Sequence, residues 1–183
     1  MATIKAKYFI ALVPEGKIQE EATALKEEMK NLFNLKYALK SPAHVTLKMP
    51  FEWNEKKEEK LIFKLQQFFT LREKFELKFK GFDRFGRRVI FIDVSRSVPL
   101  KNLQESLGKF CKQELKLINE LSDSAFHPHM TISFKDVKPK NFDIYWKHIL
   151  SRRFEADYPV HNVALLKRIE GRWQVIYRFT LKG

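Results

Sequence analysis

Cysteine, glycine and proline are scarce in this chain of 183 residues, which has 1 cysteine, 6 glycines and 7 prolines. A single cysteine, Cys111, excludes a disulfide within the chain. Its neighbours Leu107, Phe110 and Leu115 favour a buried structural thiol over a nucleophile. So few glycines and prolines indicate that low-complexity linkers are absent. The simplest location for such a protein is a reducing cytoplasm.

Long apolar segments and glycine-rich loops are also missing. No stretch reaches the roughly 18 apolar residues that a membrane-spanning helix needs. The N-terminal sequence MATIKAKYFIALVPEG carries two lysines where a signal peptide would have its apolar core, so we expect no such signal. No glycine loop of the Walker or dinucleotide type occurs, and the histidines and carboxylates are too scattered for a zinc site. We therefore expect neither a cofactor nor a metal.

Positive charge and apolar side chains are abundant instead. Lysine and arginine number 35 against 22 aspartates and glutamates, which gives a formal net charge of +13. Such an excess predicts attraction to RNA, DNA or acidic membranes, although a basic surface can also serve solubility alone. No helix combines a lysine-rich face with a strong exposed apolar face, so a peripheral membrane protein is the weaker alternative. The hydrophobic content of 44% is ample for the packed interior of one domain.

The spacing of apolar residues predicts the same series of elements twice. Strands are expected over residues 8–13, 43–49 and 75–79 and then 89–94, 130–134, 163–169 and 173–181, with helices over 18–32, 61–68, 100–118 and from 141 or 143 onward. The two series match at about the 85 positions that separate His44 from His129. A unit present twice predicts two lobes related by a pseudo-two-fold axis, because a solenoid needs about three units.

The fold class is predicted to be α+β. Pairs of strands divided by helices also suit a parallel doubly wound sheet. Against this, the strand over 75–79 alternates apolar and polar residues, which suits antiparallel pairing. We therefore predict one bilobal domain over 1–183, with repeats at 5–83 and 87–169 and a C-terminal strand at 172–181. Each lobe would be an antiparallel sheet covered by helices, with a central active-site cleft between the lobes.

Two His-x-Thr motifs occupy equivalent places in the two series. In a strand, residues i and i+2 point to the same side, so His44 lies with Thr46 and His129 with Thr131. Two imidazoles facing each other across a cleft suit general acid–base cleavage of a phosphodiester, with a bell-shaped dependence on pH. The threonine hydroxyls can donate hydrogen bonds to phosphoryl oxygens. This chemistry requires no metal.

The two motifs, HVTL at 44–47 and HMTI at 129–132, resemble the twin signatures of the two-histidine (2H) phosphoesterase superfamily, which includes bacterial 2′-5′ RNA ligase-like proteins. The contexts SPAHVTLKMPF and FHPHMTISF, the segment RRVIFIDV and the closing LLKRIEGRWQVIYRFTL extend the resemblance over nearly the whole chain. It implies a bilobal α+β fold and metal-independent action on 2′,3′-cyclic phosphates or 2′-5′ linkages in RNA or nucleotides, with ligation as the reverse reaction. It also implies that His44 donates a proton, His129 accepts one, and Thr46 and Thr131 hold phosphate.

Further basic residues are candidate RNA contacts. They are Lys48, on the predicted face of His44, Arg84, Arg87 and Arg88 in a predicted loop, and His127 two residues before His129. Arginine binds phosphate and stacks on bases, but solvated charge in a turn explains the arginines equally well. A non-catalytic RNA-binding module that keeps the cleft as a phosphate pocket is the alternative to an enzyme. In either case we expect an RNA or nucleotide partner and a monomer.

Overall fold

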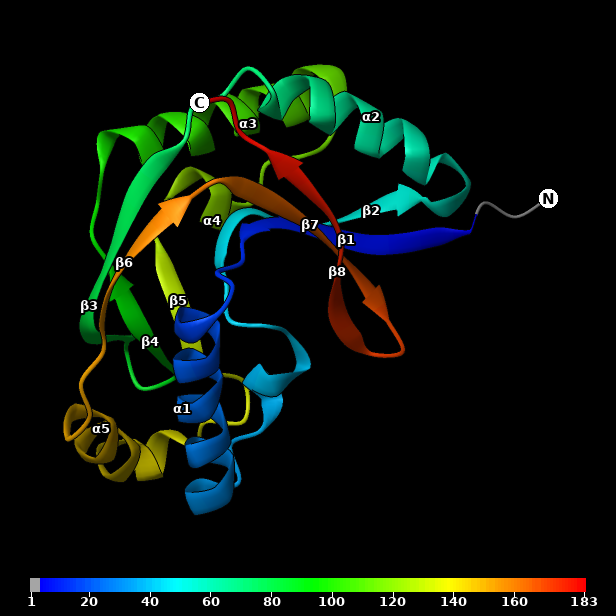
Figure 1. Ribbon diagram of the computed structural model, residues 1–183. Coiled ribbons are helices and arrows are strands. Elements are labelled where there is room, and N and C mark those ends of the chain that lie inside the picture. Colours follow the sequence, from blue (N-terminus) through cyan, green and yellow to red (C-terminus); the bar gives the residue numbers. More distant parts are fainter. Residues whose placement is uncertain (1–3) are drawn as a thin grey trace.

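One antiparallel sheet of eight strands forms the centre of the computed structural model, which describes residues 4–183 (Figure 1). The order across the sheet is β6-β3-β4-β5-β2-β1-β7-β8, and all neighbours pair antiparallel. The predicted α+β class is confirmed, and the parallel alternative is wrong. The strands are β1 (Lys5–Leu12), β2 (Val45–Asn54), β3 (Phe75–Phe85), β4 (Val89–Val94), β5 (His129–Ser133), β6 (Glu155–Val160), β7 (Asn162–Ile169) and β8 (Arg172–Thr180).

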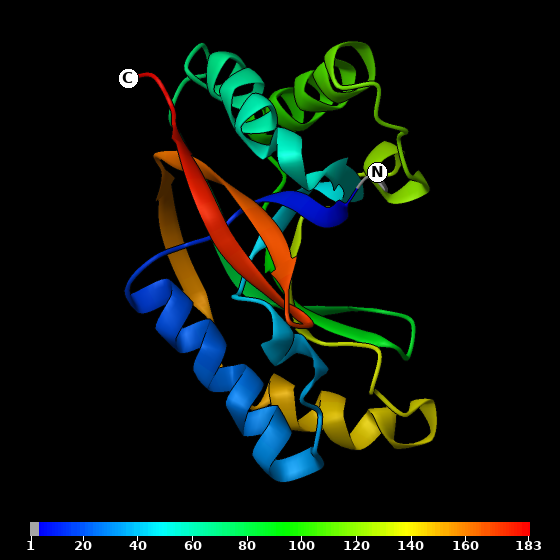
Figure 2. The ribbon, with the colours of Figure 1, turned by 90° about the vertical axis from the view of Figure 1, so that its right-hand side faces the viewer.

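The longer helices cover the sheet in two pairs. Figures 1 and 2 show α2 and α3 side by side on one side of the molecule and α1 and α5 on the opposite side. Aromatic rings join each pair, with 4.7 Å between the centroids of Phe68 and Phe110 and 5.1 Å between those of Phe33 and Tyr145. The helices are α1 (Lys17–Phe33), α2 (Glu58–Phe69), α3 (Val98–Glu114), α4 (Leu121–Ser124) and α5 (Phe142–Leu150), with 3-10 turns η1 (Tyr37–Lys40), η2 (Glu55–Lys57) and η3 (Pro139–Asn141).

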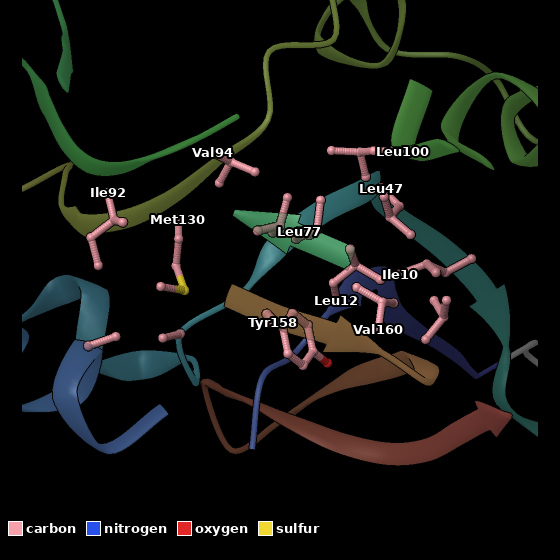
Figure 3. Close-up of a cluster of buried hydrophobic side chains, with 14 of the residues drawn as sticks. Ile10, Leu12, Leu47, Leu77, Ile92, Val94, Leu100, Met130, Tyr158 and Val160 are labelled. Carbon is pink, nitrogen blue, oxygen red and sulfur yellow. The ribbon is translucent and has the colours of Figure 1, made fainter. Parts of the chain in front are cut away.

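The main core lies between the helices and the sheet. It runs through both halves of the sheet, which are β6-β3-β4-β5 and β2-β1-β7-β8. Figure 3 shows Leu12 and Val160 in one cluster with Ile92 and Met130, which come from strands in both halves of the sheet. A second, smaller cluster lies on the other face, where Phe9, Ala11 and Val13 of the β1 segment pack with Ala164 and Leu166 of β7. Because β1 alternates between these clusters, both of its faces are buried, which explains its continuous apolar run.

The predicted repeats 5–83 and 87–169 do not coincide with the halves of the sheet. Strand β3, from the first repeat, pairs with β4 and β6 of the second, while β7 and β8 extend the sheet beyond β1. Helix α1 contacts β5, and α3 contacts β2, so each helix covers a strand of the other repeat. Strands β2 and β5 join the halves at Val45 and Met130. The sheet is therefore continuous rather than divided into two, and the bilobal description stays a prediction.

The strands differ most from the prediction at β2, β3 and β6. Strand β2 continues through Pro50 to Asn54, and β3 continues past Gly81 to Phe85. Strand β6 was not predicted, because it holds Pro159 and only two buried residues. A proline is tolerated there since β6 is an edge strand, where a missing N–H leaves no ladder partner unpaired.

The buried stripe of α1 also differs from the predicted one. The sequence predicted Leu32 on the buried face, but this side chain is 56% exposed. The fully buried residues are Ala22, Lys26 and Met29, at spacings of four and three. A lysine therefore occupies a core position on this helix.

Candidate active site

The two histidines lie at the junction of the sheet halves. His44 immediately precedes β2, and His129 is the first residue of β5. These two central strands pair antiparallel with Val45 opposite Met130. That register sets His44 beside Thr131 and Thr46 beside His129, because antiparallel partners run in opposite directions. The structure therefore brings all four predicted motif residues together.

Both imidazole rings are anchored in the same way. Nδ1 of His44 lies 2.7 Å from the carbonyl oxygen of Pro42, and Nδ1 of His129 lies 2.7 Å from that of His127. A carbonyl oxygen can only accept, so Nδ1 carries the proton in each ring. The neutral rings therefore keep a lone pair on Nε2, and each Nε2 can accept a proton or, once protonated, donate it.

Aromatic rings that the sequence did not single out support the histidines. The ring of Phe9 lies 4.8 Å from His44 and 4.8 Å from Trp173, between centroids. His129 contacts Phe85 at 4.9 Å and Phe91 at 5.1 Å. Residues 9 and 91 each sit between two core residues of a buried strand, so strand alternation could have placed them on the histidine face. Packing of this kind fixes the orientation of each imidazole and limits its contact with water.

The pKa values of both histidines are lowered. Burial lowers the pKa of His44 to about 4, with help from the positive charge of Lys26 and from the neighbouring His129. Burial also lowers the pKa of His129, against the effect of its hydrogen bond to the carbonyl of His127. In each case the cause is that a charged imidazolium loses hydration when it is buried. Both rings are therefore neutral at pH 7 when no anion is bound.

Acid should destabilise the protein through His44. In the unfolded chain this ring binds a proton below its ordinary pKa of 6.5, whereas in the folded protein it does so only near pH 4. Its stabilising contribution is therefore complete above pH 6.5 and is lost as the pH falls towards 4. We expect urea unfolding between about pH 7.5 and about pH 4.5 to show a shallower loss of stability in His44→Asn than in the wild type. If the free energy of unfolding fell equally steeply with pH in the variant and the wild type, this expectation would be contradicted. The control is His161→Asn, which changes an exposed histidine.

A cavity of about 330 Å³ opens beside His129. Its walls include Thr46, Phe85, His127 and His129, together with residues of the α4 segment. Within residues 4–183, the hydroxyls of Thr46 and Thr131 have no hydrogen-bond partner. Both hydroxyls are therefore available to a ligand that brings acceptor oxygens.

Lys48 does not share the face of His44, and this prediction is wrong. In the pairing of β1 with β2, Thr46 is the partner of Ala11 and Lys48 is the partner of the core residue Ile10. The register shifts between these two pairs. This bulge turns Lys48 towards the helices, where its side chain is 1% exposed and pairs with Asp123. Nζ also donates to the carbonyl of Ile118 at 2.9 Å, so Lys48 is not available to RNA.

Two of the three arginines of the β3–β4 hairpin, Arg84 and Arg87, contact helix α5. Phe85 contacts His129, whereas the adjacent Arg84 stacks on the helix α5 side, 5.3 Å from the ring centroid of Trp146. Arg87 makes two hydrogen bonds of 2.8 Å to Asp143 at the start of α5. Only Arg88, exposed in the turn, has no such partner in the described part of the chain. RNA contacts by Arg84 and Arg87 would therefore lie on the α5 side of the hairpin, whereas contact by Arg88 stays a prediction.

His127 does lie at the cleft. Its ring centroid is 6.5 Å from that of His129, and it lines the same cavity. Nδ1 of His127 lies 3.4 Å from the guanidinium of Arg96, which donates to it. The expectation that His127 is near a bound substrate thus keeps a geometric basis and stays a prediction.

The described chain offers no metal cluster and no membrane helix. Over residues 4–183, no group of three or more histidine, cysteine, aspartate or glutamate side chains is arranged to hold a metal ion. Among the described helices, none is long and apolar enough to cross a membrane. Cys111 is buried, as predicted, and burial raises the pKa of its thiol to about 12.

Solved structures resemble this fold over almost their whole length. TT0787 of Thermus thermophilus superimposes with a TM-score of 0.65 at 19% identity, covering 97% of this chain and 98% of that one. Escherichia coli LigT complexed with 3′-AMP gives a TM-score of 0.65 at 18% identity, covering 98% of this chain and 100% of that one. At such identities the likeness concerns the fold.

Sequence comparisons identify the family. Two relatives, provisionally named phosphoesterases, come from Geobacillus sp. and Bacillus anthracis. They are 27% identical over 180 residues and 28% identical over 179 residues, covering 97% and 96% of both chains. The family model of the 2′-5′ RNA ligase superfamily matches residues 14–172, a span that includes both histidine motifs. The chain therefore belongs to the 2′-5′ RNA ligase superfamily, the 2H phosphoesterases.

Proposed function

We propose that this protein is a metal-independent phosphodiesterase that acts on 2′,3′-cyclic phosphate or 2′-5′ linked ends of RNA or nucleotides. The observation that carries the proposal is the matched pair of histidines on adjacent strands, each anchored through Nδ1 and each beside a threonine hydroxyl. The phosphoesterase names of the relatives and the 3′-AMP complex of LigT support a phosphate ester of a nucleotide as the substrate. The net charge of +13 favours a polyanion such as RNA.

In the proposed reaction the two histidines have opposite roles. Nε2 of His129 removes a proton from a water molecule, whose oxygen then forms a bond to phosphorus. The bond from phosphorus to one ribose oxygen breaks, and that oxygen receives the proton from Nε2 of His44. Thr46 and Thr131 donate hydrogen bonds to the non-bridging oxygens, where negative charge develops. The same steps with a ribose 5′-hydroxyl in place of water, and with the bond from phosphorus to the 3′ oxygen breaking, would give 2′-5′ ligation, the reverse of cleavage of a 2′-5′ linkage.

The substrate itself helps to prepare this state. His44 is neutral in the free protein, but a bound phosphate anion favours the imidazolium form that a proton donor needs. The cytoplasmic location and the monomeric state remain predictions that accompany this proposal.

The experiment that tests the proposal is hydrolysis of an oligonucleotide ending in a 2′,3′-cyclic phosphate, with EDTA present. We expect the wild type to open the ring, and the position of phosphate in the product to show which ester bond breaks. A parallel substrate with a 2′-5′ linkage tests the other proposed ester. Binding of both oligonucleotides without any product from either would contradict the proposal and support the non-catalytic RNA-binding module instead.

A further inference from the structure

A lysine is buried behind the site without a carboxylate partner. The side chain of Lys26 on α1 is in the core, with the residue 2% exposed, and no ion pair involves it within the described residues. Burial lowers its pKa to about 8, so it still carries a positive charge at pH 7. A buried ammonium group without a counter-ion is costly in free energy. Its contacts indicate what it does there.

Lys26 holds the segment that leads to His44. Nζ donates to the carbonyl oxygens of Ala38 and Ser41, at 3.1 Å each. Gln19, seven residues earlier on the same face of α1, donates to the carbonyl of Ala43 at 2.9 Å and accepts from its N–H at 2.8 Å. Two side chains of one helix thus fix the backbone at three points between residues 38 and 43.

The anchor of the imidazole lies between these points. Pro42, whose carbonyl accepts from Nδ1 of His44, sits between Ser41 and Ala43. Movement of the 38–43 segment would therefore move the group that sets the orientation of His44. The ammonium charge also acts on the ring directly and opposes its protonation.

The other histidine has no such lysine. The offset of 85 positions between His44 and His129 makes Gln104 the sequence equivalent of Gln19 and Cys111 the sequence equivalent of Lys26. Gln104 does bond the corresponding segment, by donating to the carbonyl of Asp123 at 2.8 Å. Cys111 is uncharged and buried at the position that the lysine takes in the other half. Lys48 is also buried in this half, but it is paired with Asp123, whereas Lys26 has no carboxylate partner among the described residues.

Other charged groups lie farther along the same wall. The cavity that Lys26 and Pro42 line also borders the charged side chains of Glu15, Glu27, Lys40, Arg172 and Arg178. Glu15 pairs with Arg178 and Glu27 with Lys30, while Arg172 donates to the carbonyl of Leu39 and Lys40 lies over the ring of Tyr37. The ring of Phe9 on β1 contacts His44, and Trp173 of β8 packs against Phe9; neither ring carries a charge. At pH 7 Lys26 is therefore the charged side chain that opposes protonation of His44, and His129 adds to this effect only when it is itself protonated.

We propose that Lys26 is a positioning residue for His44: its ammonium group fixes the 38–43 segment that anchors the ring and opposes protonation of the ring until an anionic phosphate lies beside it. The arrangement distinguishes two otherwise equivalent histidines. Burial is the larger cause of the neutral state of His44, and the charge of Lys26 adds to it, so that the ring becomes a strong proton donor when the substrate supplies negative charge. The catalytic meaning rests on the proposed function, but the coupling between Lys26 and His44 does not.

The test is an NMR titration of the histidine rings in the full chain. In Lys26→Gln, which keeps a donor but removes the charge, we expect the pKa of His44 to rise by about one unit. Lys26→Arg keeps the charge and should leave the pKa of His44 within a few tenths of the wild type. The matched control is Lys30→Gln, which removes a charge from the exposed side of α1, one turn further on. In the wild type, inorganic phosphate should raise the pKa of His44.

An unchanged pKa of His44 in a folded Lys26→Gln variant would overturn the proposal. A second measurement needs no variant: a wild-type His44 with a pKa at or above 6.5 would overturn it as well. Neither readout depends on turnover, so the proposed phosphodiesterase activity can fail while this coupling stands. If the activity is present, we expect Lys26→Gln to shift the pH dependence of kcat/KM and to leave KM nearly unchanged.

Discussion

Alanine in place of His44 or His129 is expected to lower kcat for opening of a cyclic phosphate by roughly 10²–10⁴-fold. Each variant removes one of the two Nε2 atoms that transfer protons in the proposed reaction. Both rings are held by backbone carbonyls at 2.7 Å, which leaves each Nε2 free for proton transfer. Because the two groups act in one step, the double variant should be little worse than the weaker single variant.

The measurement is the initial rate of hydrolysis of an oligonucleotide with a 2′,3′-cyclic phosphate end, with each variant first shown to be folded by circular dichroism. His161→Ala is the matched control, because His161 is exposed and its hydrogen bond to Leu181 uses the backbone. His148 is a poor control, since its Nε2 lies 2.8 Å from Glu28 and links α5 to α1. Full activity in both His44→Ala and His129→Ala would sink the two-histidine mechanism.

Asp123→Ala is expected to lower the free energy of unfolding by about 3–5 kcal/mol. Asp123 and Lys48 form an ion pair in which the side chains are 3% and 1% exposed. The carboxylate also accepts the backbone N–H groups of Met49 and Glu120, at 2.9 Å each. Alanine would leave a buried ammonium group and two partly buried N–H donors without their acceptor, and each of these losses is unfavourable.

Urea unfolding at pH 7 measures this effect. The control is Asp157→Ala, which breaks an exposed pair with Lys78 and should cost less than about 1 kcal/mol. The double variant Lys48→Met/Asp123→Leu should be more stable than Asp123→Ala, because it removes both buried charges together. Equal effects of Asp123→Ala and Asp157→Ala would show that the buried pair contributes nothing special to stability.

Local patterns in the sequence predicted most of the secondary structure. The strand over 89–94 was placed as the structure has it, and the helix after Pro99 begins at Val98 with Ser97 accepting from the N–H of Leu100. The turn at Glu170 and Gly171 was also confirmed, with φ angles of 49° and 78°. These features succeed because apolar period, capping and turn residues act over a few positions.

Patterns failed where a residue's role depends on its partners. The two-residue alternation of a strand predicted Lys48 on the same face as His44, but a bulge in the pairing with β1 turns the Lys48 side chain to the other face. The hairpin arginines were candidate RNA contacts, and two of the three instead pack on helix α5. Lys26 was passed over, because a lysine on a helix is ordinarily solvated.

By itself, the sequence determined the α+β class, the two His-x-Thr motifs and their separation, and a composition suited to a polyanionic substrate. Only the tertiary structure decided that β2 and β5 are neighbours and that α1 and α3 each cover a strand of the other repeat. It also decided that Lys26 holds the segment that leads to His44. The physical reason is the range of the interactions. Helix and strand periods are set by neighbours along the chain, whereas strand order, bulges and buried charges are set by contacts between segments far apart in sequence.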